Sequence, residues 1–247
     1  MFKIITKTDD FVVISKNADV SFHDEGEYGS GLFTAVKKYC LSELSIKELF
    51  PVHRLDKITS VLLIFATNSY SAKIFGELFT QHKVEKYYLA ISENKPLKKQ
   101  GLIKGDMAKS RRGMYKLMRT MENPAITQFF SYSIGNKQRL YLLKPHSGKT
   151  HQLRVALNSI GVPIFGDPLY TSKVTASSHK IKDRGYLHAF AMKFEFLSQT
   201  YEFISPPSEG ELFLSDSIQM QIKKFLRMLS LKTSYIKKVQ TMTPLIF

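Results

Sequence analysis

The sequence predicts an α+β domain, because it carries two kinds of apolar pattern. Short runs rich in β-branched and aromatic residues, such as residues 61–66, are typical of strands. Apolar residues spaced three and four apart, as in residues 153–160, are typical of helices that pack on one side. The runs 126–134 and 139–143 flank Gly135-Asn136-Lys137, which favours a β-hairpin. A chain of 247 residues suits one large domain or two small ones.

The same patterns give an order of elements. We expect strands at residues 4–5, 11–14, 61–66, 83–91 and 186–196, and helices at 32–44, 68–81, 153–161 and 216–229. The unbroken apolar run that starts at Val61 indicates a strand buried on both faces. The last helix is basic and amphipathic, so we expect it to pack on the body of the protein.

The charge balance points to a polyanionic partner. The 36 Lys and Arg residues outnumber the 21 Asp and Glu residues by 15, and the isoelectric point is about 9.7. Such a surplus favours binding to nucleic acid or to an anionic membrane, with simple solubility as the alternative. No apolar run approaches the roughly 20 residues that cross a bilayer, so we expect no membrane partner. The single Cys40 excludes an internal disulfide and argues for a reducing cytoplasm.

Residues 53–60 form a dense polar cluster directly before the apolar run at 61–66. The cluster reads His-Arg-Leu-Asp-Lys-Ile-Thr-Ser, with Asp56 at its centre. A loop of reactive groups anchored by a core strand is a common way to build an active site. A solvated loop in which Arg54 and Asp56 pair locally is the alternative.

A second cluster, residues 146–155, leads into the helix expected at 153–161. His151, Arg154 and Asn158 are expected on one face of that helix, beside its apolar stripe. In the strand at 83–91, Tyr88 alternates with Tyr87 and Leu89. Taken alone, each pattern also fits an ordinary surface helix or sheet residue.

Together these segments resemble the RluA-type RNA pseudouridine synthases. The resemblance rests on His-Arg-Leu-Asp-x-x-Thr-Ser at 53–60, Lys-x-Tyr-Leu-Ala at 86–90, and Gly-Lys-Thr-His-Gln-Leu-Arg-Val at 148–155 followed by residues 160–170. It spans about residues 4–207, and we expect no S4 RNA-binding module before it. Ile58, Val61 and Lys149 depart from the family pattern, which usually has a polar residue, Gly and Arg at those places.

The resemblance implies isomerisation of uridine to pseudouridine in ribosomal or transfer RNA, with the target base flipped out. It implies a mixed, mainly antiparallel sheet flanked by helices, with a basic cleft. We expect residues 1–210 to form the catalytic domain and residues 211–247 a helix and tail packed on it. We expect a monomer, no cofactor and no metal, since the sequence shows no GxGxxG, P-loop, HExxH or CxxC motif.

The family's site residues carry over to matching positions. Asp56 is implied as the essential carboxylate, Arg154 as its ion-pair partner, and Tyr88 as the ring that stacks on the uracil. Arg154 can favour the charged form of Asp56. The residues expected to bind RNA are His53, Arg54, Thr59, Lys149, His151 and Gln152, with the basic segment 97–121 as a further phosphate contact.

Two alternatives from other classes stay open. One is a non-catalytic RNA-binding protein of the same fold, to which the departures at Ile58, Val61 and Lys149 would point. The other is a metal-dependent hydrolase that uses His53, Asp56, His146 and His151, although no HxH or HxxxH pair supports it.

Overall fold

A computed structural model gives the structure of residues 1–53, 56–135, 137–171 and 183–233. Of residues 61 and 228–233 it describes the backbone course alone. The strands are β1 (Phe2–Lys7), β2 (Phe11–Lys16), β3 (Phe50–Pro51), β4 (Thr59–Ala66), β5 (Glu85–Ser92), β6 (Gln100–Gly105), β7 (Met107–Lys109), β8 (Tyr115–Leu117), β9 (Ala125–Gly135), β10 (Gln138–Pro145), β11 (Leu187–Phe196) and β12 (Gln199–Ile204). The helices are α1 (Leu32–Leu44), α2 (Ser69–Thr80), α3 (Gln152–Ser159), α4 (Glu211–Leu214), α5 (Asp216–Thr233) and the 3-10 turn η1 (Arg111–Gly113).

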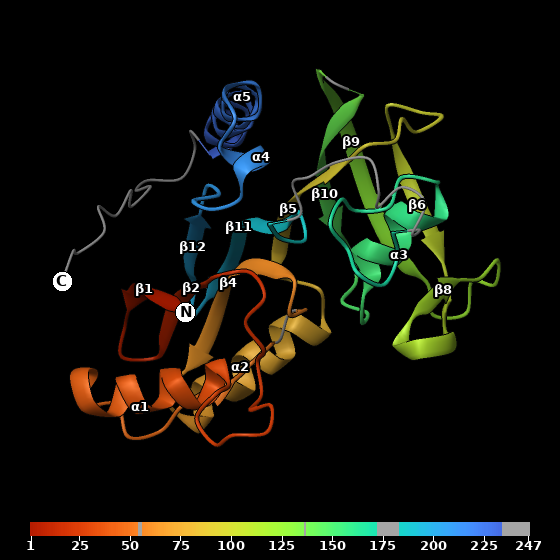
Figure 1. Ribbon diagram of the computed structural model, residues 1–247. Coiled ribbons are helices and arrows are strands. Elements are labelled where there is room, and N and C mark those ends of the chain that lie inside the picture. Colours follow the sequence, from red (N-terminus) through yellow and green to blue (C-terminus); the bar gives the residue numbers. More distant parts are fainter. Residues whose placement is uncertain (54–55, 136, 172–182, 234–247) are drawn as a thin grey trace.

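One large sheet forms the centre of the molecule, with the strand order β1-β2-β4-β11-β5-β10-β9-β6 (Figure 1). β12 adds to β11, β3 adds to β4, and β7 and β8 form a separate hairpin. Only β4 and β11 pair in parallel, through residues 59–60 and 187–188, among the strand pairs of the described chain. The predicted mixed, mainly antiparallel α+β fold is therefore confirmed.

Three apolar clusters cover the two faces of this sheet. On one face α1 and α3 pack against side chains that include Leu63, Tyr88 and Tyr141. On the other face α5 packs on β5 and β10, and α2 packs on β2, β4 and β11. Figure 1 shows α1 and α2 beside the β1, β2 and β4 half of the sheet, and α3 beside β9 and β10. The centre of the sheet is thus covered on both sides, as predicted for β4.

Local sequence explains where several elements begin and end. The Asn68 side chain accepts a hydrogen bond from the Ser71 amide at 2.8 Å, which caps α2 at the start of the range expected for this helix. α1 has the predicted bounds, 32–44. β9 and β10 form the predicted hairpin, with Gly135 opposite Gln138, and Gly135 has a φ of 92°. No described helix is long and apolar enough to cross a bilayer.

The structure corrects one prediction about α3. His151 does not share a helix face with Arg154 and Asn158, because it precedes the helix with a left-handed φ of 57°. Asn158 is exposed, whereas all of residues 152–157 are buried. The helical stripe in the sequence therefore marks a helix enclosed on several sides, in which the polar residues Gln152 and Arg154 are buried.

The packing of α5 gives a first testable prediction. Phe225 has no exposed surface and meets the ring of Tyr132 edge-on, with centroids 5.0 Å apart. Phe225→Ala should lower the free energy of unfolding by about 3–5 kcal/mol, because it opens a cavity between helix and sheet. Met220→Ala, on the same helix and 61% exposed, should change it by less than about 0.5 kcal/mol. Urea unfolding would measure both, and equal effects would contradict the docking of α5.

Candidate active site

The loop before β4 places Asp56 at the surface of a buried sheet. The Asp56 carbonyl accepts a hydrogen bond from the Thr59 amide at 3.0 Å, which closes a turn at the start of β4. The next carbonyl, of Lys57, accepts one from the buried Lys16 ammonium at 3.1 Å. Arg54, an expected RNA contact, lies outside the described residues. The loop is therefore fixed through its backbone, while the Asp56 carboxylate stays 22% exposed.

Arg154 binds two carboxylates at once. Its Nε and Nη2 donate to the two oxygens of Asp167 at 2.7 and 2.8 Å, and its Nη1 donates to Asp56 Oδ2 at 3.3 Å. Arg154 is 4% exposed and the Asp167 side chain is fully buried. The shorter, bidentate pair is thus with Asp167, which fixes the plane of the guanidinium. The remaining nitrogen points at Asp56.

The carboxylates keep Arg154 charged in spite of its burial. Burial alone would lower the pKa of the guanidinium, but Asp167 and then Asp56 more than offset this and raise the pKa above its ordinary value. A buried cation thus faces Asp56 at every working pH.

Tyr88 lies in β5, in the middle of the sheet, opposite Leu143 of β10 and Ala189 of β11. It is 5% exposed. Burial, and secondarily the charge of Asp56, raises the pKa of its hydroxyl well above the ordinary value. Tyr88 therefore remains a neutral phenol near the Asp56 carboxylate.

A further tyrosine, Tyr170, also lies at the site; it ends the third sequence motif, but no role was predicted for it. Its ring lies 5.1 Å from the Arg154 guanidinium carbon. Its hydroxyl accepts from the Tyr115 amide at 2.8 Å and lies 3.0 Å from His151 Nδ1. The other nitrogen of His151 is 4.0 Å from Asp56. The β7–β8 hairpin, the start of α3 and the loop that carries Asp56 therefore meet at one place.

Gln152, an expected RNA contact, uses its whole side-chain amide inside the protein. Its oxygen accepts from the Ser147 hydroxyl at 2.8 Å and the Lys149 amide at 3.0 Å. Its nitrogen donates to the Ile126 carbonyl at 3.0 Å and the Thr127 hydroxyl at 3.1 Å. The structure places Gln152 as the support of the loop before α3, away from a free surface.

His53 is likewise engaged within the fold. Its Nε2 accepts a hydrogen bond from the Ile64 amide at 3.0 Å, and its ring stacks on Phe79 with centroids 4.7 Å apart. Burial lowers the pKa of His53 to about 3, with a smaller effect from Lys86. A neutral imidazole can accept this hydrogen bond, so His53 joins the start of the Asp56 loop to β4.

The last two expected contacts differ in exposure. Thr59 is 1% exposed and lies opposite Leu187 in the sheet, so it reaches the site through its backbone. Lys149 is partly exposed, and its ammonium donates to Asn123 Oδ1 at 2.8 Å. Of the side chains expected to bind RNA, the structure places only His151 next to Asp56 within the described residues.

Comparison with known proteins assigns the family. A family model described as RNA pseudouridylate synthase matches residues 10–159, more than half of the chain. An uncharacterized RNA pseudouridine synthase of Haemophilus influenzae is 45% identical over 224 residues, which are 91% of this chain and 96% of that protein. The chain belongs to the RNA pseudouridine synthase family.

More distant members extend the comparison. The ribosomal large subunit pseudouridine synthase C of Rickettsia bellii is 34% identical over 68% of this chain and 56% of its own length. The tRNA pseudouridine synthase C of Haemophilus ducreyi is 32% identical over 68% of this chain and 73% of its own. The structure of human RNA Pseudouridylate Synthase Domain Containing 1 shares the fold, with a TM-score of 0.69, 22% identity, and coverage of 92% and 95%.

The structure accommodates two of the departures from the family pattern, Ile58 and Val61. Ile58 is 7% exposed and packs on Gly185, where an added Cβ would lie 3.0 Å from that of Ile58. An apolar residue at 58 therefore fills space beneath the loop. Val61 continues β4 opposite Lys16, with the strand pairing intact.

A buried polar network holds the first residues of β4. Ser60 Oγ lies 2.6 Å from His188 Nδ1 and accepts from Arg184 at 2.7 Å. The other His188 nitrogen lies 2.6 Å from the Ser205 carbonyl, and Arg184 pairs with Glu209 at 3.0 Å. Burial lowers the pKa of His188 to about 4, so it is neutral near pH 7 and can donate to Ser205 while accepting from Ser60. The start of β4, directly after the Asp56 loop, is thereby linked to Ser205 and Glu209, which follow β12.

The hydrolase alternative lacks a ligand cluster. Its candidate residues are His53, Asp56, His146 and His151, and the part of the chain that the structure describes holds no group of three His, Cys, Asp or Glu side chains that could bind a metal ion. His53 is engaged with Ile64, as described above.

The two partners of Arg154 should differ in their effect on stability. Asp167→Ala should lower the free energy of unfolding by about 3–5 kcal/mol, because it removes the buried partner of a buried charge. Asp56→Ala removes a partly exposed partner of the same guanidinium and should cost about 1 kcal/mol or less. Chemical unfolding of the two variants would test this order, and the reverse order would show that Asp56 is the structural partner.

Proposed function

We propose that this chain isomerises a specific uridine in RNA to pseudouridine, with Asp56 as the essential carboxylate. The observation that carries the proposal is the Asp56 carboxylate held 3.3 Å from a guanidinium whose other side is bound by Asp167. In the reaction the C1′–N1 bond breaks, a C1′–C5 bond forms, the hydrogen on C5 leaves as a proton, and N1 takes up a proton. Atoms and electrons balance within the uridine, so we propose that no metal or cofactor takes part.

Each side chain then has a role set by its surroundings. Asp56 acts as nucleophile or base at the nucleoside. Arg154 keeps Asp56 ionised and oriented, and its own orientation comes from Asp167. Tyr88 offers a flat ring to the loosened uracil and a neutral hydroxyl that can relay the C5 proton.

Access to Asp56 requires the target base to leave its stack. We propose that the nucleotide flips into the site, at a cost of a few kcal/mol, and that Arg54 fills the vacated space. The surplus of 15 positive charges supports tight, salt-dependent binding to the RNA backbone. His151 and Lys149 are the contacts we propose close to the target nucleotide.

The substrate class follows from the relatives' names. One relative is named for the large ribosomal subunit and another for tRNA, so we propose ribosomal or transfer RNA as substrate. We propose that the chain acts as a monomer in the cytoplasm, which the single, free and buried Cys40 supports. We propose residues 1–210 as the catalytic domain, with residues 211–247 as an addition to the same body.

The central test follows the C5 hydrogen. Wild type, incubated in a chelator with ribosomal or transfer RNA tritiated at uridine C5, should release tritium to water. Asp56→Asn should reduce release to background while its unfolding curve stays near that of wild type. Wild-type binding without release would instead support a non-catalytic RNA-binding protein, and release by Asp56→Asn would remove Asp56 from its role.

Arg154→Lys tests the role of the guanidinium. Lysine keeps the charge beside buried Asp167 but cannot bind two carboxylates in one plane. The maximal rate of tritium release should fall by about 100-fold while RNA affinity changes little. Lys149→Ala is the contrasting variant and should weaken RNA binding with a near-normal maximal rate. A loss of affinity in Arg154→Lys that matches its loss of rate would make Arg154 a phosphate contact.

A further inference from the structure

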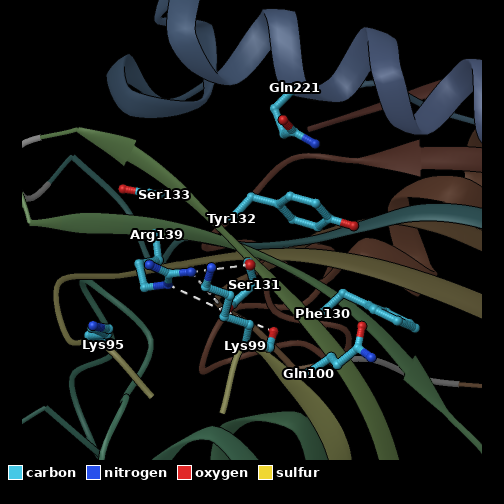
Figure 2. A pocket seen from close by; sticks show the side chains of 9 residues that line it. All are labelled: Lys95, Lys99, Gln100, Phe130, Ser131, Tyr132, Ser133, Arg139 and Gln221. Atoms are coloured by element: carbon cyan, nitrogen blue, oxygen red, sulfur yellow. Dashed lines mark hydrogen bonds between the residues drawn. The ribbon is translucent and has the colours of Figure 1, made fainter. Parts of the chain in front are cut away.

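A pocket lies away from Asp56, at the edge of the sheet where β9 extends beyond its pairing with β6. β6 begins at Gln100, which pairs with Phe130, so the last five residues of β9 have no β6 partner. The segment of residues 95–99 crosses this gap, and α5 lies above it (Figure 2). The resulting cavity of about 490 Å³ is lined by residues that include Lys95, Lys99, Ser131, Tyr132, Arg139 and Gln221. We call it the edge pocket.

The edge pocket carries positive charge without a matching acid. Lys95, Lys99 and Arg139 line it, and no Asp or Glu does. Glu93 adjoins Ser92, the strand partner of Arg139, but is not among the lining residues. None of the three cations forms an ion pair within the described ranges. Three cations that converge on one cavity favour an anion there.

Arg139 is the strongest sign of a missing partner. It is 8% exposed, and its guanidinium bonds only to neutral oxygens of Ser131: Nε and Nη2 to Oγ at 3.4 and 3.2 Å, and Nη2 to the carbonyl at 3.2 Å. Its Nη1 makes no hydrogen bond to any residue that the structure describes. Nη1 is not among the fully buried side-chain atoms that lack a partner in the described residues, so it reaches solvent and is open to a phosphate oxygen, which it would bind through a charge-assisted bond.

The strand register relates the edge pocket to the candidate active site. In the pairing of β10 with β5, Leu143 lies opposite Tyr88 and Arg139 lies opposite Ser92. Residues four apart on a strand point to the same face and are about 14 Å apart. Arg139 therefore leaves the sheet on the same face as Tyr88, at a distance that a few nucleotides of RNA can span.

We propose that the edge pocket binds a backbone phosphate of the RNA substrate, a few nucleotides from the uridine at Asp56. This inference rests on the proposed function, since it takes RNA as the ligand. Lys95, Lys99 and Nη1 of Arg139 bind the phosphate oxygens. In Figure 2, Tyr132 and Gln221 lie on the opposite side from Arg139 and Lys95, toward α5, so the phosphate contacts come from the three cations. The pocket thereby favours RNA long enough to reach both sites.

The test compares two double variants that lose the same charge. Lys95→Ala/Lys99→Ala removes two cations of the pocket. Lys98→Ala/Lys137→Ala removes two exposed lysines from the same region that do not line it. Binding of fluorescein-labelled oligouridines of 3 and 12 nucleotides is followed by anisotropy over a range of salt concentrations. Arg139→Gln is the third variant, and thermal unfolding checks each fold.

The expected result is specific to the long oligomer and to the pocket. Lys95→Ala/Lys99→Ala should bind the 12-mer about tenfold more weakly, with the slope of log K against log salt reduced by about 0.7, because one phosphate contact is lost. Binding of the 3-mer should be unchanged. Lys98→Ala/Lys137→Ala should lose less than about threefold. Folded Arg139→Gln should resemble the first variant.

Three results would overturn the proposal. One is equal weakening by both double variants, which would indicate diffuse charge. Another is unchanged 12-mer binding in the Lys95→Ala/Lys99→Ala protein, whatever Arg139→Gln does. The third is competition by inorganic phosphate that depends on Lys95 and Lys99 without any 12-mer effect, which would indicate a site for a free anion. Tritium release by wild type tests the proposed function separately, because it does not depend on the oligouridine comparison.

Discussion

The candidate site depends on one guanidinium held between two carboxylates. Arg154 is buried and bonded in two places to a fully buried Asp167, which leaves one nitrogen for Asp56. A buried charge must be paired, so the position of Arg154 is determined by Asp167 before any substrate is present. Asp56, the more exposed partner, is then placed beside a cation whose orientation is set by Asp167. This arrangement favours the ionised form of Asp56.

The sheet brings these groups together from distant parts of the chain. The loop that carries Asp56 leads into β4, and Tyr88 lies in β5. β11 lies between these two strands, paired in parallel with β4 and antiparallel with β5. α3 packs on the same face through Leu153, Ala156 and Leu157. Since both faces of the central strands are covered by helices, the backbone beneath the site is rigid. The polar network around Ser60 and His188 adds a second attachment at the start of β4.

The buried cations of the chain differ in the partners that they bind. Lys16 and Arg184 are buried and bond to carbonyls, a hydroxyl and a carboxylate, so they serve the fold. Arg139 is buried as well, yet it meets only neutral oxygens. By this difference we distinguish Lys16 and Arg184, which stabilise the fold, from Arg139, for which we propose a phosphate ligand. It also explains why net charge alone indicates a polyanion without locating where it binds.

The sequence by itself determined the type and order of most elements, because apolar periodicity is a local property. The bounds of α1 and the start of α2 within a residue were predicted from the sequence, and the three motifs indicated the family. The resemblance also implied the pair of Arg154 and Asp56, which are 98 positions apart. The sequence did not indicate the other polar contacts of the site, and Asp167 lay in a motif without an assigned role. Gln152 belonged to a motif, but only tertiary packing decided that all its hydrogen bonds are internal. The left-handed turn at His151, the ring of Tyr170 and the edge pocket have the same origin, since contacts between distant side chains are set by how the sheet and helices pack.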